Sequence, residues 1–148
     1  MIRIYTSYVP ILFSLRFITI ISHLVLLIIL LLDRNPNTNK FIENSSGLYN
    51  SSDLTQFDTE YIVWLSVSLG ILVIELTSFL FTVSSLVIYQ SLISILTHSI
   101  GVFVIFGFYT DAWIFSDIRW VFGFCTAIPF LTEILAYVEI FIRKKTYF

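Results

Sequence analysis

Cysteine, charge and glycine are all scarce in this chain of 148 residues. Cys125 is the only cysteine, which excludes an internal disulfide, a CxxC redox pair and a thiolate metal cluster. The five glycines are spread singly and form no phosphate-binding loop. Only 12% of the residues are charged, about half the share in soluble domains. No basic cluster is longer than 143–145, so nothing indicates binding to nucleic acid.

Long apolar runs make up most of the chain, which is 57% hydrophobic. We expect helices over about 10–32, 61–83, 88–109 and 119–142. Each is close to the roughly 20 residues that a helix needs to cross the hydrocarbon core. The sequence therefore predicts an all-α polytopic membrane protein, a four-helix transmembrane bundle in one domain over 1–148, surrounded by membrane lipid. No small-residue cleavage site follows the first run, so we expect it to remain as a spanning helix.

The second and third runs are joined by TVSSLVIYQ, a connection without a charge, a glycine or a proline. So short a link predicts that the two helices are antiparallel and in contact. The other helices are expected to pack around this hairpin.

The stretch 33–60 is rich in Asn, Ser, Asp and Thr and predicts an extracytoplasmic loop. It holds two Asn-x-Ser/Thr sequons, at Asn44 and Asn50, which are candidate N-glycosylation sites and fit a glycoprotein. Lys and Arg support the same orientation, with five on the side of the chain ends and three on the other. By the positive-inside rule, both termini are predicted to be cytosolic.

Ionisable groups inside the predicted helices are few, and they fall at similar depths. At 1.5 Å per residue, Arg16, Glu75, His98 and Glu133 lie roughly 9–16 Å from the cytosolic ends of their helices. A charge at such depth costs about 2.5–3.5 kcal/mol or more when it faces lipid. We therefore expect these four residues to meet in one layer, called the polar layer below.

Small residues on the same helices predict where the helices pack closely. These candidate helix-packing residues are Ser66, Gly70, Ser94, Gly101 and Pro129. Pro129 also predicts a bend in the fourth helix, because it removes a backbone hydrogen bond.

Three interpretations of the polar layer remain open from the residues alone. Glu75, His98 and Glu133 could form the path of a small proton- or cation-coupled transporter. Two carboxylates with imidazoles could bind zinc or a di-iron centre, although no helix has HxxxH or ExxH spacing. The third interpretation is structural, with the layer fixing helix register. No nucleophile–base pair appears, so the sequence predicts no enzyme, no cofactor and no small-molecule substrate.

Three segments resemble the transmembrane protein 107 family in order and in residue identity: 62–80, 90–99 and 119–134. In the first segment the similar features are the S-V-x-L-G spacing that ends at Gly70 and the later Glu75. In the second they are the run 90–95 and His98. In the third they are Phe124-Cys125, Pro129 and Thr132-Glu133. The resemblance covers most of the chain from about Tyr8 and lapses in 33–57.

The resemblance implies a non-enzymatic four-pass protein of the ciliary transition zone membrane. Family members belong to the Meckel-syndrome (MKS) module with tectonic proteins. There they help to make the diffusion barrier that controls protein localisation to the cilium, and hence cilium assembly. It also implies structural roles for Glu75, His98, Pro129 and Glu133. From the residues themselves, we expect contacts with partners to be lateral, between helices, through small-residue faces at Ser66 and Gly70 or at Gly101.

Overall fold

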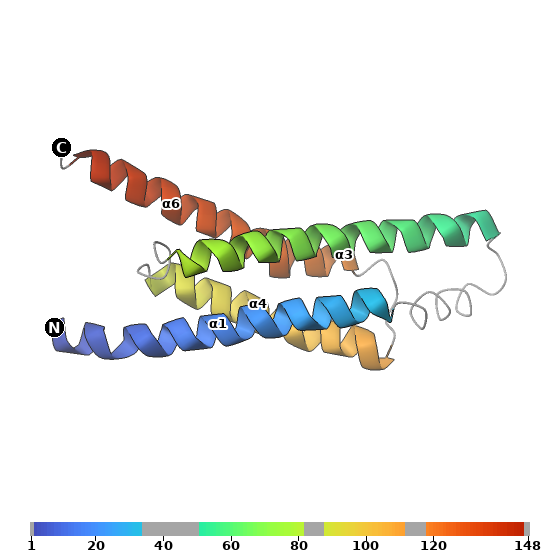
Figure 1. Ribbon diagram of the computed structural model, residues 1–148, viewed down its shortest axis with the longest axis horizontal. Coiled ribbons are helices and arrows are strands. Elements are labelled where there is room, and N and C mark those ends of the chain that lie inside the picture. Colours follow the sequence, from blue (N-terminus) through green and yellow to red (C-terminus); the bar gives the residue numbers. More distant parts are fainter. Residues whose placement is uncertain (1, 34–50, 82–87, 112–117, 147–148) are drawn as a thin grey trace.

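The computed structural model describes residues 2–33, 51–81, 88–111 and 118–146, and these parts are helical (Figure 1). The helices are α1 (Ile2–Leu32), α3 (Ser51–Leu80), α4 (Ile88–Asp111) and a composite fourth helix. The fourth consists of α5 (Ile118–Val121), the π-helical segment η3 (Phe122–Ala127) and α6 (Ile128–Thr146). All four are long and apolar enough to cross a membrane, over Pro10–Leu32, Thr55–Leu80, Ile88–Thr110 and Arg119–Glu139. The predicted all-α, four-helix membrane fold is confirmed.

The two ends of the chain lie at the same end of the bundle (Figure 1). α1 packs most extensively against α4 and also contacts α3, while η3 and α6 pack on α3 and α4. The expectation that the bundle packs around an α3–α4 hairpin is wrong, because α3 and α4 meet mainly through the long side chain of Glu75 and α1 is the main neighbour of α4. In the figure, α6 leans away from α1 toward its C-terminal end.

The helix α3 is longer than the sequence suggested. It begins at Ser51, so the prediction of a loop over 33–60 is wrong for residues 51–60. Despite its polar composition, this segment begins an apolar stripe at helical spacing. Phe57, Tyr61 and Leu65 follow one another at steps of four residues, and all three pack in or against the core. The rest of that loop, with Asn44 and Asn50, lies outside the described residues.

The helix α1 also extends beyond its expected start, from Ile2 and through Pro10. A proline ends many helices, which made residue 10 the expected boundary. The residues before Pro10 include no glycine or second proline, so nothing else there breaks the helix. The part able to cross a membrane, Pro10–Leu32, begins at the expected residue.

The fourth helix is disturbed just before Pro129. In η3 the turns widen, and the N–H of Ile128 bonds to the carbonyl of Gly123, five residues back. In a regular α-helix the ring of Pro129 would clash with the carbonyl of Cys125, four residues back. A π-helical turn moves that carbonyl and relieves the clash. The disruption expected from Pro129 thus takes the form of a widened turn.

The apolar core occupies the half of the bundle farther from the chain ends. Its fully buried members include Ile20, Leu30, Leu72, Ile105 and Phe108. The outer surface is equally apolar, with Phe103 78% exposed and Phe141 70% exposed. Such a surface suits lipid, so the described helices form a multi-pass integral membrane protein.

Candidate functional site

The half of the bundle nearer the chain ends contains a buried ion pair between its first and last helices. Nη2 of Arg16 on α1 lies 2.6 Å from Oε2 of Glu133 on α6. The same Nη2 lies 3.6 Å from Oε1 of Glu75 on α3. These side chains are 0%, 3% and 0% exposed, respectively. The guanidinium also lies over the ring of Phe79, 5.2 Å from its centroid, so aromatic and acidic groups both stabilise its charge.

The two carboxylates are held from α4 as well. Glu75 Oε1 accepts a hydrogen bond from Ser94 Oγ at 3.0 Å and contacts His98 Nε2 at 3.1 Å. Glu133 Oε2 accepts a hydrogen bond from Gln90 Nε2 at 2.8 Å. The same amide lies 3.3 Å from the carbonyl oxygen of Pro129. Each carboxylate therefore has a polar partner on α4 in addition to Arg16.

A second imidazole extends this network toward the apolar core. Nδ1 of His23 on α1 lies 3.0 Å from Nδ1 of His98, with the rings edge to face. In such a hydrogen bond one nitrogen donates and the other accepts. If His98 donates from Nε2 to Glu75 and is neutral, its Nδ1 accepts and His23 donates. A continuous chain of polar groups thus runs from His23 through His98 to Glu75.

Gly101 allows the two histidines to meet. A Cβ at this position would lie 2.6 Å from Cε1 and 2.9 Å from Nδ1 of His23, and 3.1 Å from Cβ of Cys125. Any side chain at residue 101 would therefore displace the His23 ring. The absence of a side chain lets α1 and α4 approach closely where the imidazoles pair.

The charges of this site balance with one added proton. Arg16 carries one positive charge, against two negative charges when Glu75 and Glu133 are both ionised. A proton on Glu75 Oε2 or Glu133 Oε1 would leave every contact above in place, because neither oxygen has a hydrogen-bond partner within the described residues. The arrangement can thus hold four ionisable residues at membrane depth at low net charge.

The structure brings together all four residues expected in the polar layer: Arg16, Glu75, His98 and Glu133. Sequence reasoning missed Gln90 and left His23 out of the layer. Gln90 is the first buried polar residue of α4, and its uncharged side chain kept it out of the list of ionisable groups. Its spacing of four to Ser94 and eight to His98 places all three on one helix face, which is a signal that could have revealed it.

The candidate helix-packing residues do not share one role. Ser94 bonds to Glu75, Gly101 faces His23, and Pro129 is buried beside Gln90. Ser66 and Gly70 lie on the exposed face of α3, and a Cβ at Gly70 would meet nothing within 4 Å. A docking face at Gly101 is therefore wrong, because that glycine is inside the bundle. Among the described residues, no group of three His, Cys, Asp or Glu is placed to hold a metal ion.

Comparison with known proteins decides the family. The model of the family TMEM107, described as a transmembrane protein, matches residues 12–137, which include every residue of the polar layer. The chain belongs to the transmembrane protein 107 family. It is 32% identical to transmembrane protein 107 of Xenopus laevis and 32% identical to that of Homo sapiens, each over 130 residues. Each alignment covers 88% of this chain and 91% of the relative. The counterpart in Mus musculus is 29% identical over the same length. No solved structure matches the chain.

Proposed function

We propose that this protein is a non-enzymatic membrane component of the ciliary transition zone. In this role it helps to assemble the Meckel-syndrome module and the diffusion barrier that controls which proteins enter the ciliary membrane. The observation that carries the proposal is membership of the transmembrane protein 107 family along 88% of the chain. Both termini would be cytosolic, as the distribution of Lys and Arg indicates.

The geometry of the polar layer supports a structural role. Arg16, Glu75 and His98 are 0% exposed, and each bonds to another member of the layer or to α4. Buried polar groups that satisfy one another fix one register of the helices, because any other register leaves a charge facing lipid. The layer therefore favours a rigid scaffold over a transporter, which needs its ionisable groups to reach water.

Partners of such a scaffold would bind sideways, through the outer helix faces. Ser66 and Gly70 form a small-xxx-small pair on α3, and both lie on the exposed side of that helix. This face would meet the helices of tectonic and other Meckel-syndrome module proteins. No nucleic acid, cofactor or small-molecule substrate enters this role.

The test is the location of a tagged copy in a ciliated cell. The proposal predicts a focus at the base of the cilium, overlapping a transition-zone marker. Uniform staining of the endoplasmic reticulum or plasma membrane would contradict it. The substitutions Glu75→Gln and Glu133→Gln, combined with Arg16→Met so that no buried cation is left unpaired, separate the two function classes. A scaffold that still folds keeps its location, whereas a transporter loses its ion path.

A further inference from the structure

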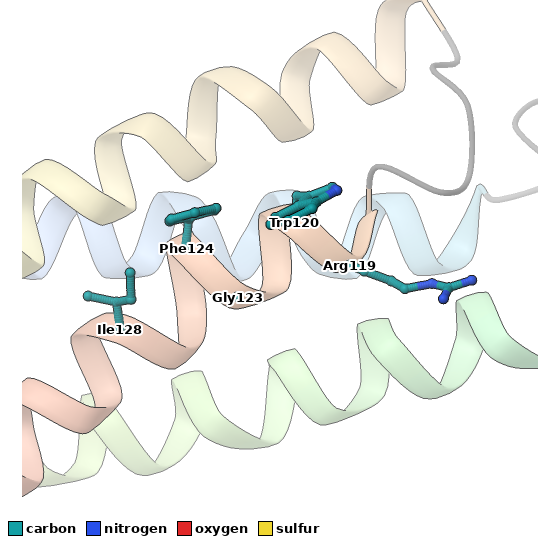
Figure 2. Close-up of a pocket in the computed structure, with 5 residues that line it drawn as sticks. All are labelled: Arg119, Trp120, Gly123, Phe124 and Ile128. Carbon is teal, nitrogen blue, oxygen red and sulfur yellow. The ribbon is translucent and has the colours of Figure 1, made fainter.

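A groove runs along the exposed side of the fourth helix, on the part of that helix before Pro129. It is lined by Arg119, Trp120, Gly123, Phe124 and Ile128 and has a volume of about 660 Å³ (Figure 2). Four of the five lining residues carry no charge, and three are large apolar residues. Trp120 is 68% exposed, Phe124 56% and Ile128 38%, so the groove opens to the surroundings of the bundle.

One part of the groove lies beside Gly123 of η3, which has no side chain, and this part is called the hollow below. A Cβ at Gly123 would meet nothing within 4 Å, so the space beside this residue is open. On the helix around it, Trp120, Phe124 and Ile128 follow one another at steps of four residues and project from the same side in Figure 2. The rings of Trp120 and Phe124 are stacked, with centroids 6.0 Å apart and planes 17° apart. These side chains form an apolar wall about 12 Å long beside the glycine.

A cation lies at one end of the groove. Arg119 is the first residue of the membrane-crossing part of this helix, Arg119–Glu139. Its side chain is 56% exposed, and Nη2 lies 3.6 Å from Oε2 of Glu60. That separation is longer than a hydrogen bond, and a guanidinium has five N–H donors, which leaves capacity for a phosphate. Trp120 beside it is a residue type that favours the membrane interface.

The groove therefore presents a cation at the membrane boundary and an apolar hollow that continues into the membrane. A phospholipid has the same order of groups, a phosphate followed by acyl chains. A guanidinium binds phosphate through paired hydrogen bonds. A helix of another protein would need an acidic residue at the depth of Arg119 to match it, and a sterol offers only a hydroxyl.

We propose that this groove is a binding site for one glycerophospholipid. Its phosphate binds Arg119, and one acyl chain lies over Gly123 against Trp120, Phe124 and Ile128. The lipid belongs to the leaflet at the end of the bundle opposite the two chain ends. Glu60 competes with the phosphate for the guanidinium. This site is independent of the ciliary role, and either can fail without the other.

The test is native mass spectrometry of the purified full chain, titrated with dioleoylphosphatidylglycerol. One lipid should bind more tightly than the others, and Arg119→Gln should weaken it about tenfold, as expected for loss of a charged hydrogen bond. Arg119→Lys should lose less, and Glu60→Gln should bind more tightly. Gly123→Leu should abolish the tight site by filling the hollow. Gly70→Leu is the matched control and should bind as the unchanged protein does, because it adds the same side chain at another open glycine.

Two further measurements keep the proposal falsifiable if a variant folds poorly. Circular dichroism checks that Gly123→Leu keeps its helices. A phospholipid with a diazirine in its acyl chain should label Phe124 or Ile128 in the unchanged protein. The proposal is overturned if labelling falls elsewhere, if Arg119→Gln and Gly123→Leu bind normally, or if dioleoylglycerol or cholesterol binds as tightly as the phosphate-bearing lipid.

Discussion

Arg16 and Glu133 form an ion pair of 2.6 Å although they are 117 positions apart in the chain. This contact joins the first membrane-crossing helix to the last. Glu75 on α3 lies 3.6 Å from Arg16, and Gln90 on α4 donates a hydrogen bond to Glu133. All four helices therefore contribute a side chain to this buried polar cluster. The bundle is therefore closed by polar contacts in the half near the chain ends and by apolar packing in the other half.

Breaking this ion pair should destabilise the bundle strongly. Arg16→Met leaves two buried carboxylates without their cation, and loss of one partner of a buried pair costs about 3–5 kcal/mol. Adding Glu133→Gln to Arg16→Met should recover part of the loss, because one buried negative charge is removed. Reversible unfolding in detergent or bicelles measures each free energy of unfolding. Losses that simply add would show that the two residues are not coupled.

Gly101 should tolerate no side chain. Gly101→Ala places a Cβ 2.6 Å from the His23 ring, and such overpacking costs about 1–3 kcal/mol. Gly70→Ala is the control, since its Cβ meets nothing within 4 Å and the stability should be unchanged or slightly higher. Equal melting temperatures for the two variants would contradict the close approach of α1 and α4.

Gln90 should matter more than a hydroxyl bonded within its own helix. Gln90→Leu removes the donor to Glu133 and should cost about 1–3 kcal/mol, since a charged acceptor loses a hydrogen bond. Ser68→Ala is the comparison, because Ser68 Oγ donates only to the carbonyl of Trp64, one turn back, and this change should cost little. The same unfolding assay ranks the two, and a larger loss for Ser68→Ala would reject the assigned role of Gln90.

The exposed face of α3 should hold the partner proteins. Gly70→Leu adds bulk between partner helices without touching its own bundle, so tectonic and other module proteins should no longer co-purify while membrane insertion continues. Gly123→Leu adds the same side chain on a different helix and should keep these partners. Unchanged co-purification of Gly70→Leu would count against this face.

The polar layer could be predicted because an ionisable side chain inside a membrane is unfavourable unless it faces other polar groups of the protein. Counting residues along each apolar run was enough to bring Arg16, Glu75, His98 and Glu133 to similar depths. Gln90 escaped this count because an amide carries no charge. The role of Gly101 depends on which ring it faces, and helix rotation cannot be read from hydropathy alone.

The ends of helices were harder to predict than their existence. Residues 51–60 contain enough Ser, Asp and Thr to resemble a loop, yet α3 begins at Ser51 and Phe57 packs against the core. For Pro129 the sequence predicted a bend, whereas the structure shows a π-helical segment just before it, because the form depends on how the preceding carbonyls are accommodated. A proline inside a helix can be accommodated by a π-helical turn or by a simple kink, and the sequence does not distinguish the two.

Labelling of single cysteines tests most directly that the chain crosses the membrane four times. Ile2→Cys, Ser51→Cys and Thr146→Cys place a thiol near each chain end and at the opposite end of the bundle, and the buried Cys125 serves as an internal control. A membrane-impermeant maleimide should label Ile2→Cys and Thr146→Cys from one side and Ser51→Cys from the other, with Cys125 unlabelled. Labelling of the two chain ends from opposite sides would contradict the four-pass bundle and its buried layer.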